Sequence, residues 1–128
     1  MKRFSLIQLQ YEIASWKRLL DFIINENIYF KIQLSAVLKG KIDHEMLEEA
    51  ESLQNRFIKE DEWVGLLRSE IAEVELMLNK AIADNQLSND HLDQSVKKLR
   101  HSIHNTEKQF EILRTAFISY LSENVKYG

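Results

Sequence analysis

Apolar residues recur along most of this chain at intervals that alternate between three and four positions. Leu6, Leu9, Ile13 and Trp16 begin this pattern. Residues three and four apart lie on one face of an α-helix, so the spacing is typical of amphipathic helices that bury one stripe. The pattern runs through three long stretches of the chain. It therefore predicts helices over 4–39, 43–83 and 89–125, each ~50–60 Å long at 1.5 Å per residue.

We call the residues on this spacing the seam. In the first predicted helix the seam consists of Leu6, Leu9, Ile13, Trp16, Leu20, Ile23, Asn27, Phe30, Leu34 and Val37. In the second it consists of Met46, Ala50, Leu53, Phe57, Glu60, Val64, Leu67, Ile71, Val74, Leu78 and Ala81. In the third it consists of Leu92, Val96, Leu99, Ile103, Thr106, Phe110, Leu113, Phe117, Tyr120 and Asn124. Nearly all of these residues are apolar, so we expect the helices to bury the seam against one another.

Two polar interruptions separate the predicted helices. Gly40 suits the residue after a helix end, where a positive φ costs glycine nothing, and Asp43 suits the N-cap of the next helix. Ser88 or Asn89 would cap the third helix in the same way. Short connections of this kind favour antiparallel neighbours.

These observations predict an all-α fold, a single domain over residues 1–128. We expect an elongated antiparallel three-helix bundle with coiled-coil-like packing. Gly65 leaves one alternative open, because a glycine inside a helix costs roughly 1 kcal/mol against alanine. If the second helix breaks there, the fold becomes a four-helix bundle.

Three polar residues interrupt the seam away from the chain ends: Asn27, Glu60 and Thr106. Folding the second helix back on the first places Asn27 opposite roughly residue 55, about one turn from Glu60. Folding the third back on the second places Thr106 opposite roughly residue 65. We therefore expect the three to form a buried polar layer, because buried polar groups persist only with partners. Such a layer can specify register at a cost in stability, or it can line a ligand pocket.

The first predicted helix is more apolar than its seam requires. The additional apolar residues away from the seam include Ile7, Tyr11, Phe22, Ile28, Tyr29 and Ile32. A contiguous stripe of aliphatic and aromatic side chains outside the core marks an interface when the chain itself does not cover it. These six residues are our candidate interface. The alternative is that the first helix is central and covered on all sides by its own chain.

Composition restricts the classes of partner. The formal net charge of −3 provides no electrostatic basis for binding nucleic acid or an anionic membrane. No stretch approaches the roughly 18 consecutive apolar residues that a membrane span needs. The chain contains no cysteine, which excludes disulfides and thiolate sites and is compatible with a reducing compartment. We therefore expect a cytoplasmic protein.

No arrangement of residues predicts catalysis or a cofactor. His101 and His104 share one helical face but lie away from the seam, where nothing would enclose a metal ion. Glycine occurs only at positions 40, 65 and 128, which excludes a glycine-rich phosphate loop. We expect no enzymatic activity, no cofactor and no metal.

The sequence therefore favours a non-enzymatic assembly or adaptor module that acts through protein–protein contacts. Its partner would be a second copy of the chain or another helical protein, and the contact would follow the first helix. The alternative function is a small-ligand-binding or regulatory bundle that uses the mid-bundle polar residues as a pocket.

Overall fold

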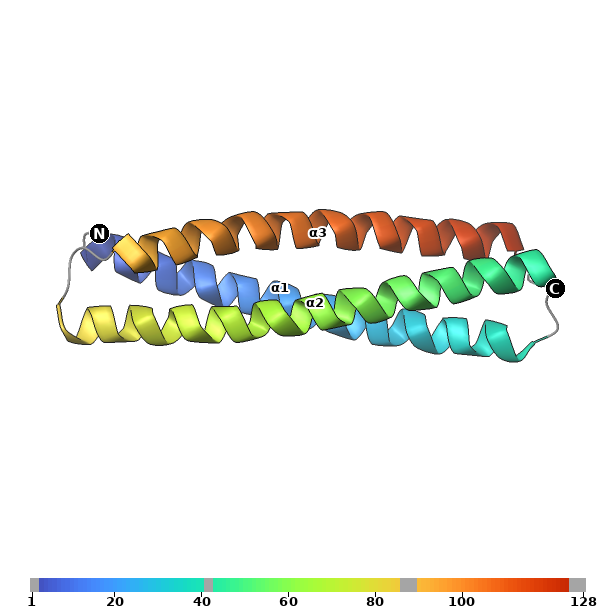
Figure 1. The fold of residues 1–128 in the computed structure, drawn as a ribbon, viewed down its shortest axis with the longest axis horizontal. Coiled ribbons are helices and arrows are strands. Elements are labelled where there is room, and N and C mark those ends of the chain that lie inside the picture. Colours follow the sequence, from blue (N-terminus) through green and yellow to red (C-terminus); the bar gives the residue numbers. More distant parts are fainter. Residues whose placement is uncertain (1–2, 41–42, 86–89, 125–128) are drawn as a thin grey trace.

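The computed structural model describes residues 3–40, 43–85 and 90–124. Over these residues the chain forms three long helices: α1 (Arg3–Lys39), α2 (His44–Ala83) and α3 (Asp90–Asn124). Successive helices run in opposite directions and lie side by side along their length, which makes the molecule elongated (Figure 1). The predicted all-α three-helix bundle is confirmed, and each helix end lies within one residue of its predicted position.

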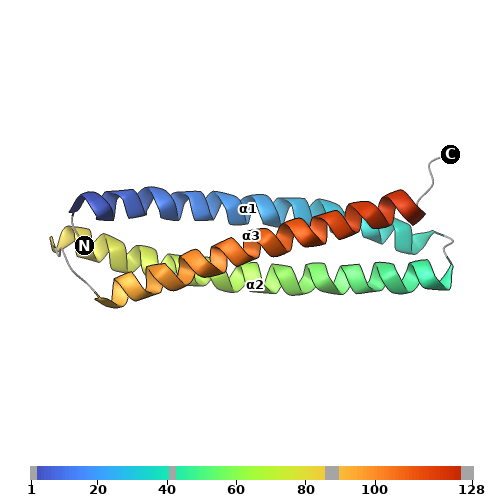
Figure 2. The ribbon, with the colours of Figure 1, turned by 90° about the horizontal axis from the view of Figure 1, so that it is seen from above.

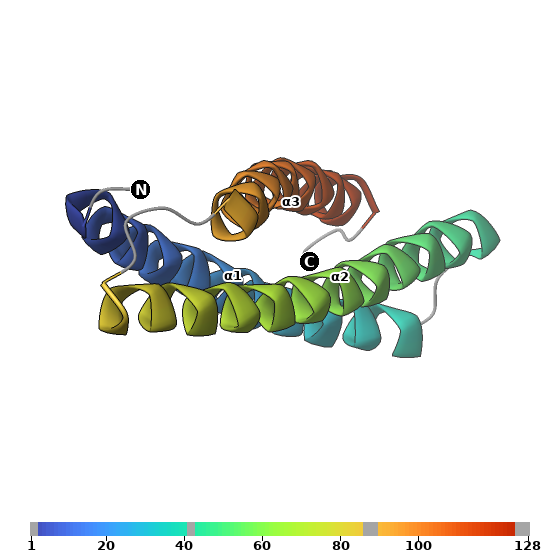
Figure 3. The same ribbon diagram turned by 60° about the vertical axis from the view of Figure 1, so that its left-hand side comes forward.

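The three helices do not pack with threefold regularity. α2 packs closely against both α1 and α3, whereas α1 and α3 approach each other less closely. Figure 2 shows α3 running obliquely across the pair formed by α1 and α2. Seen closer to end-on, α1 and α2 cross in one layer, and α3 lies on one side of that layer (Figure 3).

The core coincides with the seam. Among the described residues, every side chain that the fold buries is a seam residue, from Leu6 in α1 to Tyr120 in α3. The seam residues that are only partly buried are Val37, Met46, Glu60 and Asn124. Because burial of a large apolar side chain contributes about 1.5–3 kcal/mol, this continuous stripe supplies the main driving force for the fold.

An aromatic layer occupies the core in the half of the bundle that contains the C-terminal ends of α1 and α3. Phe30, Phe57 and Phe117 come from the three different helices, and their ring centroids lie 5.2–5.7 Å apart. Aromatic pairs at such separations contribute about 0.5–1.5 kcal/mol beyond the burial of their area. This aromatic layer therefore ties all three helices together at one level.

The described helix ends follow ordinary capping chemistry. Asp43 is the N-cap of α2, as predicted, and its side chain accepts a hydrogen bond from the Met46 amide at 2.8 Å. Gly40 does not adopt the positive φ expected of it, and its amide donates to the Val37 carbonyl at 3.1 Å. Asn85 adopts one instead, at φ 54°, just after α2. The N-cap predicted at Ser88 or Asn89 lies outside the described residues.

Helix α2 is continuous through Gly65, so the four-helix alternative is wrong. Gly65 is exposed, and a Cβ atom built on it would meet nothing within 4 Å. A close approach by another described helix therefore does not explain the glycine. Over the three described stretches, no helix combines the length and the apolarity that crossing a membrane requires.

Candidate functional site

A polar network joins α1 to α2 in the middle of the bundle. The Asn27 side chain is fully buried, and its Nδ2 donates to Glu60 Oε1 at 2.8 Å and to Asp61 Oδ1 at 3.4 Å. Asp61 also forms an ion pair with Lys31 of α1. The predicted neighbours Asn27 and Glu60 thus contact each other directly.

Two features of this network are energetically costly. The Oδ1 atom of Asn27 is buried and has no hydrogen-bond partner among the described residues. An unsatisfied buried acceptor costs about 1–3 kcal/mol. Burial raises the pKa of Glu60 above its ordinary value of 4.5; the Asn27 hydrogen bond opposes this shift, nearby Asp61 adds to it and Arg56 reduces it. Burial thus disfavours the charged form of Glu60.

A second polar contact joins α2 to α3 at the same level. Trp63 Nε1 donates to Thr106 Oγ1 at 2.7 Å, and the Thr106 hydroxyl donates to the Ser102 carbonyl at 2.7 Å. Thr106 is 1% exposed, whereas Trp63 is 43% exposed. The threonine therefore uses its hydroxyl to hold the indole ring in place at the surface.

These residues line a groove between α2 and α3. The groove has a volume of about 510 Å³ and is lined by Glu60, Trp63, Asn105, Thr106 and Gln109. We call it the α2–α3 groove. It extends inward to two members of the predicted polar layer, Glu60 and Thr106, while Asn27 lies behind Glu60 on α1.

The polar layer is thus divided into two contacts that share the α2–α3 groove. Asn27 bonds Glu60, whereas Thr106 bonds Trp63, a residue that the seam pattern does not predict to belong to the polar layer. Trp63 directly flanks the seam one residue before Val64, and a large aromatic residue beside a polar seam position is the signal that could have identified it. Lys31 and Asp61 also flank the seam, four and one residues after Asn27 and Glu60 respectively.

The six residues of the candidate interface lie on the outer side of α1. All are exposed in the single chain, from 42% for Ile7 to 75% for Tyr11. At 3.6 residues per turn they fall within about 120° of the helix circumference. Phe22 also contacts Phe110 of α3 edge-on, with ring centroids 5.8 Å apart. We call these six residues the α1 outer face. The contact between Phe22 and Phe110 lies at the edge of this face.

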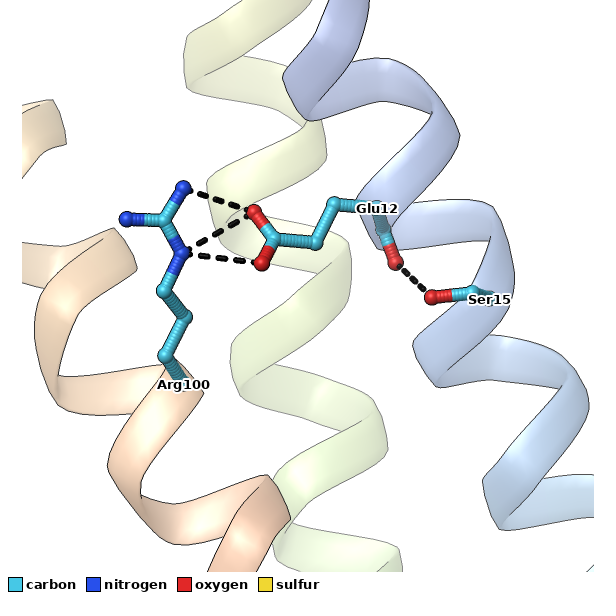
Figure 4. A network of polar contacts seen from close by, with 3 residues as sticks. All are labelled: Glu12, Ser15 and Arg100. Carbon is cyan, nitrogen blue, oxygen red and sulfur yellow. Dashed lines mark hydrogen bonds and ion pairs between the residues drawn. The ribbon is translucent and has the colours of Figure 1, made fainter.

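Ion pairs flank the seam on both sides of α1. Arg100 of α3 donates two hydrogen bonds to Glu12 Oε1, at 2.7 and 3.0 Å, and one to Oε2 at 2.9 Å (Figure 4). The hydrogen bonds to Glu12 raise the pKa of Arg100. Lys17 pairs with Glu75 of α2 at 2.6 Å. Because the side chains of these pairs are partly exposed to solvent, each pair contributes no more than about 1 kcal/mol.

The histidines do not assemble into a site. His101 Nε2 lies 3.2 Å from Asn105 Nδ2, and both residues are exposed. Within the part of the chain that the structure describes, no three histidine, aspartate or glutamate side chains are placed to share a metal ion. No family model, no curated protein and no solved structure matches this chain.

Proposed function

We propose that this protein is a non-enzymatic assembly module that self-associates along the α1 outer face. The observation that carries the proposal is that the described part of the chain leaves this face exposed. Six of the twelve large hydrophobic side chains exposed among the described residues belong to α1. Such a patch marks an interaction surface, and isoleucine, tyrosine and phenylalanine suit the centre of one.

The order of residues on this face favours a second copy of the chain as the partner. In an antiparallel pair related by a two-fold axis midway between positions 19 and 20, residue i faces residue 39 − i. Ile7 then faces Ile32, and Tyr11 faces Ile28. A two-fold contact requires a self-complementary surface of this kind.

The charges at the centre of the α1 outer face have the same symmetry. Arg18 of one chain would face Asp21 of the other, and the pair would occur twice. Among the described residues, the one ion pair of Asp21 is a long contact of 3.8 Å with Arg68, and both side chains are more than half exposed. Asp21 can therefore form a new pair at little cost. An apolar patch with opposite charges at its centre fixes both the register and the direction of the pair.

Analytical ultracentrifugation tests the proposal. The triple substitution Tyr11→Glu, Ile28→Glu and Ile32→Glu should convert a dimer into a monomer with an unchanged cooperative melt. The matched control is Leu66→Glu, Leu76→Glu and Ile112→Glu, which changes residues of similar exposure on α2 and α3. The control should stay dimeric. A wild-type monomer at all concentrations, or equal effects of the two triple variants, would overturn the proposal.

A charge exchange tests the register. Arg18→Glu would place two acidic groups opposite each other twice, and it should weaken the dimer at least about tenfold. Adding Asp21→Arg restores opposite charges and should restore most of the affinity. If the double variant dimerises as weakly as the single one, the antiparallel register is wrong.

The cytoplasmic location stays a prediction.

A further inference from the structure

The α2–α3 groove presents hydrogen-bond acceptors that the fold does not use. Glu60 Oε1 accepts from Asn27, but no hydrogen bond among the described residues reaches Glu60 Oε2. The Asn105 amide nitrogen faces His101, so its carbonyl oxygen is open to another donor. Gln109 lines the same groove and is exposed. The lining of the groove thus includes one carboxylate and two amide side chains, whose oxygens can accept hydrogen bonds from a ligand.

Glu60 forms no ion pair with a cationic side chain of the described residues. Its neighbour Asp61 forms an ion pair with Lys31, so those two charges compensate each other. Arg56 acts on Glu60 from a distance, but no ion pair of the described residues includes Glu60. A half-buried carboxylate without a cationic partner attracts a cation more strongly than an exposed one does, because water screens it less.

Trp63 forms an aromatic wall beside this carboxylate. Its indole nitrogen is fixed by Thr106, so the ring is held in one orientation before any ligand arrives. The face of an indole ring attracts cations and packs against alkyl groups. The Thr106 hydroxyl accepts from Trp63 and donates its one hydrogen to Ser102, and its side chain is almost completely buried. It therefore acts as a positioning residue for Trp63.

We propose that the α2–α3 groove is a binding site for a small primary alkylammonium ion. An ammonium group carries three N–H donors, which matches Glu60 Oε2 and the amide oxygens of Asn105 and Gln109. Its alkyl chain would lie against the Trp63 ring. The volume of about 510 Å³ falls within the range of small-molecule sites. The inference does not rest on the proposed self-association, because the groove and the α1 outer face belong to different helices.

The indole N–H signal of Trp63 provides a direct readout by NMR. The chain has two tryptophans, Trp16 and Trp63, and a Trp63→Phe variant assigns the two indole signals. We would titrate the full chain at pH 7.5 with n-butylammonium chloride, using n-butanol as the uncharged ligand and tetramethylammonium chloride as the cation without N–H donors. The Trp63 signal should shift and saturate at millimolar n-butylammonium, and at least tenfold more of either control compound should be needed.

Two variants that each remove one negative charge distinguish binding in the groove from a general effect of net charge. Glu60→Gln should weaken n-butylammonium binding at least tenfold, whereas Glu62→Gln, at an exposed position two residues away, should leave it unchanged. The proposal is overturned if the Trp63 signal does not respond to n-butylammonium. It is also overturned if n-butanol or tetramethylammonium binds as tightly, or if the two glutamate variants behave alike.

Discussion

Two neighbouring layers of the same core differ in how they hold the helices together. In the aromatic layer, Phe30, Phe57 and Phe117 contact one another across all three helices. One turn away, the polar layer links α1 to α2 through Asn27 and Glu60. It links α2 to α3 through a separate contact, and it opens into a groove. The three rings of the aromatic layer contact one another and contain no polar atom that needs a partner. In the polar layer, Asn27 Oδ1 has no hydrogen-bond partner and Glu60 has no ion pair among the described residues.

This difference assigns distinct roles to the two layers. Close-packed aromatic rings contribute stability without needing solvent or a ligand. Buried polar groups contribute little net stability, and they retain unused hydrogen-bonding capacity where the partners do not match. We therefore expect substitutions in the aromatic layer to destabilise the protein, and apolar substitutions in the polar layer to stabilise it.

The largest expected effect is on the aromatic layer. Phe57 is fully buried, and Phe57→Ala removes its ring contacts and leaves a cavity. It should lower the free energy of unfolding by about 3–5 kcal/mol. For a chain of this size the melting temperature should fall by ~10–20 °C in thermal denaturation followed by circular dichroism. The control Ile58→Ala, at a 43% exposed position, should cost less than about 1 kcal/mol. Similar losses from the two variants would contradict the role given to the aromatic layer.

The second effect has the opposite sign. Asn27→Leu combined with Glu60→Leu removes the unpaired Oδ1 and the half-buried carboxylate. It should raise the free energy of unfolding by about 2 kcal/mol in urea titrations. The control Asn55→Leu, at an exposed position of α2, should change it little. A less stable double variant would show that the polar network supports the core rather than weakening it.

The sequence predicted the core almost completely, because helical spacing and apolar character are local properties. Every buried residue of the described helices lies on the predicted seam, and Asp43 caps α2 as expected. At Gly65 the sequence left open whether the second helix continues or breaks. The seam keeps its spacing across this glycine, and α2 is continuous there. One unfavourable residue costs less than breaking two turns of packed helix.

The polar layer was only partly predictable. Simple back-folding placed Asn27 about one turn from Glu60, whereas the two side chains bond directly. Sequence spacing sets the level of a residue along the bundle but not the side toward which its side chain turns. Thr106 lies at the expected level, yet it bonds the flanking Trp63 rather than the other polar seam residues. Which residues beside the seam contact the polar layer can be predicted only when the rotation of each helix about its axis is known.

The third prediction concerns the ionisation of Glu60. Its pKa is raised in the folded protein, so the proton is held more tightly there than in the unfolded chain. The resulting stability is fully present below the ordinary pKa of 4.5 and is lost as the pH rises through the folded value. Glu60→Gln imitates the neutral form, so it should add about 1 kcal/mol at pH 7 and almost nothing at acidic pH. Urea titrations of both proteins across this range measure the difference.

The charge environment of Glu60 makes this test specific. Asn27 on α1 and Arg56 on α2 favour the ionised form, whereas burial and Asp61 favour the neutral one. On α3, the groove presents only uncharged side chains to Glu60. The control Glu62→Gln removes an equal charge at an exposed position. A gain from Glu60→Gln that is constant with pH, or equal to that of Glu62→Gln, would mean that burial of the carboxylate is not its cause.

The smallest expected effect is that of Gly65→Ala, which changes the helix propensity of the backbone without changing a side-chain contact. Gly65 follows the Trp63 contact on the exposed side of α2, where a Cβ atom has free space. Gly65→Ala should therefore raise the free energy of unfolding by about 0.5–1 kcal/mol and the melting temperature by ~2–4 °C. Ala72→Gly, seven residues further along α2 and also exposed, is the reverse control and should lose a similar amount. If Gly65→Ala instead lowers the melting temperature or weakens self-association, a second chain packs against α2 at this glycine. The α1 outer face would then not be the whole interface.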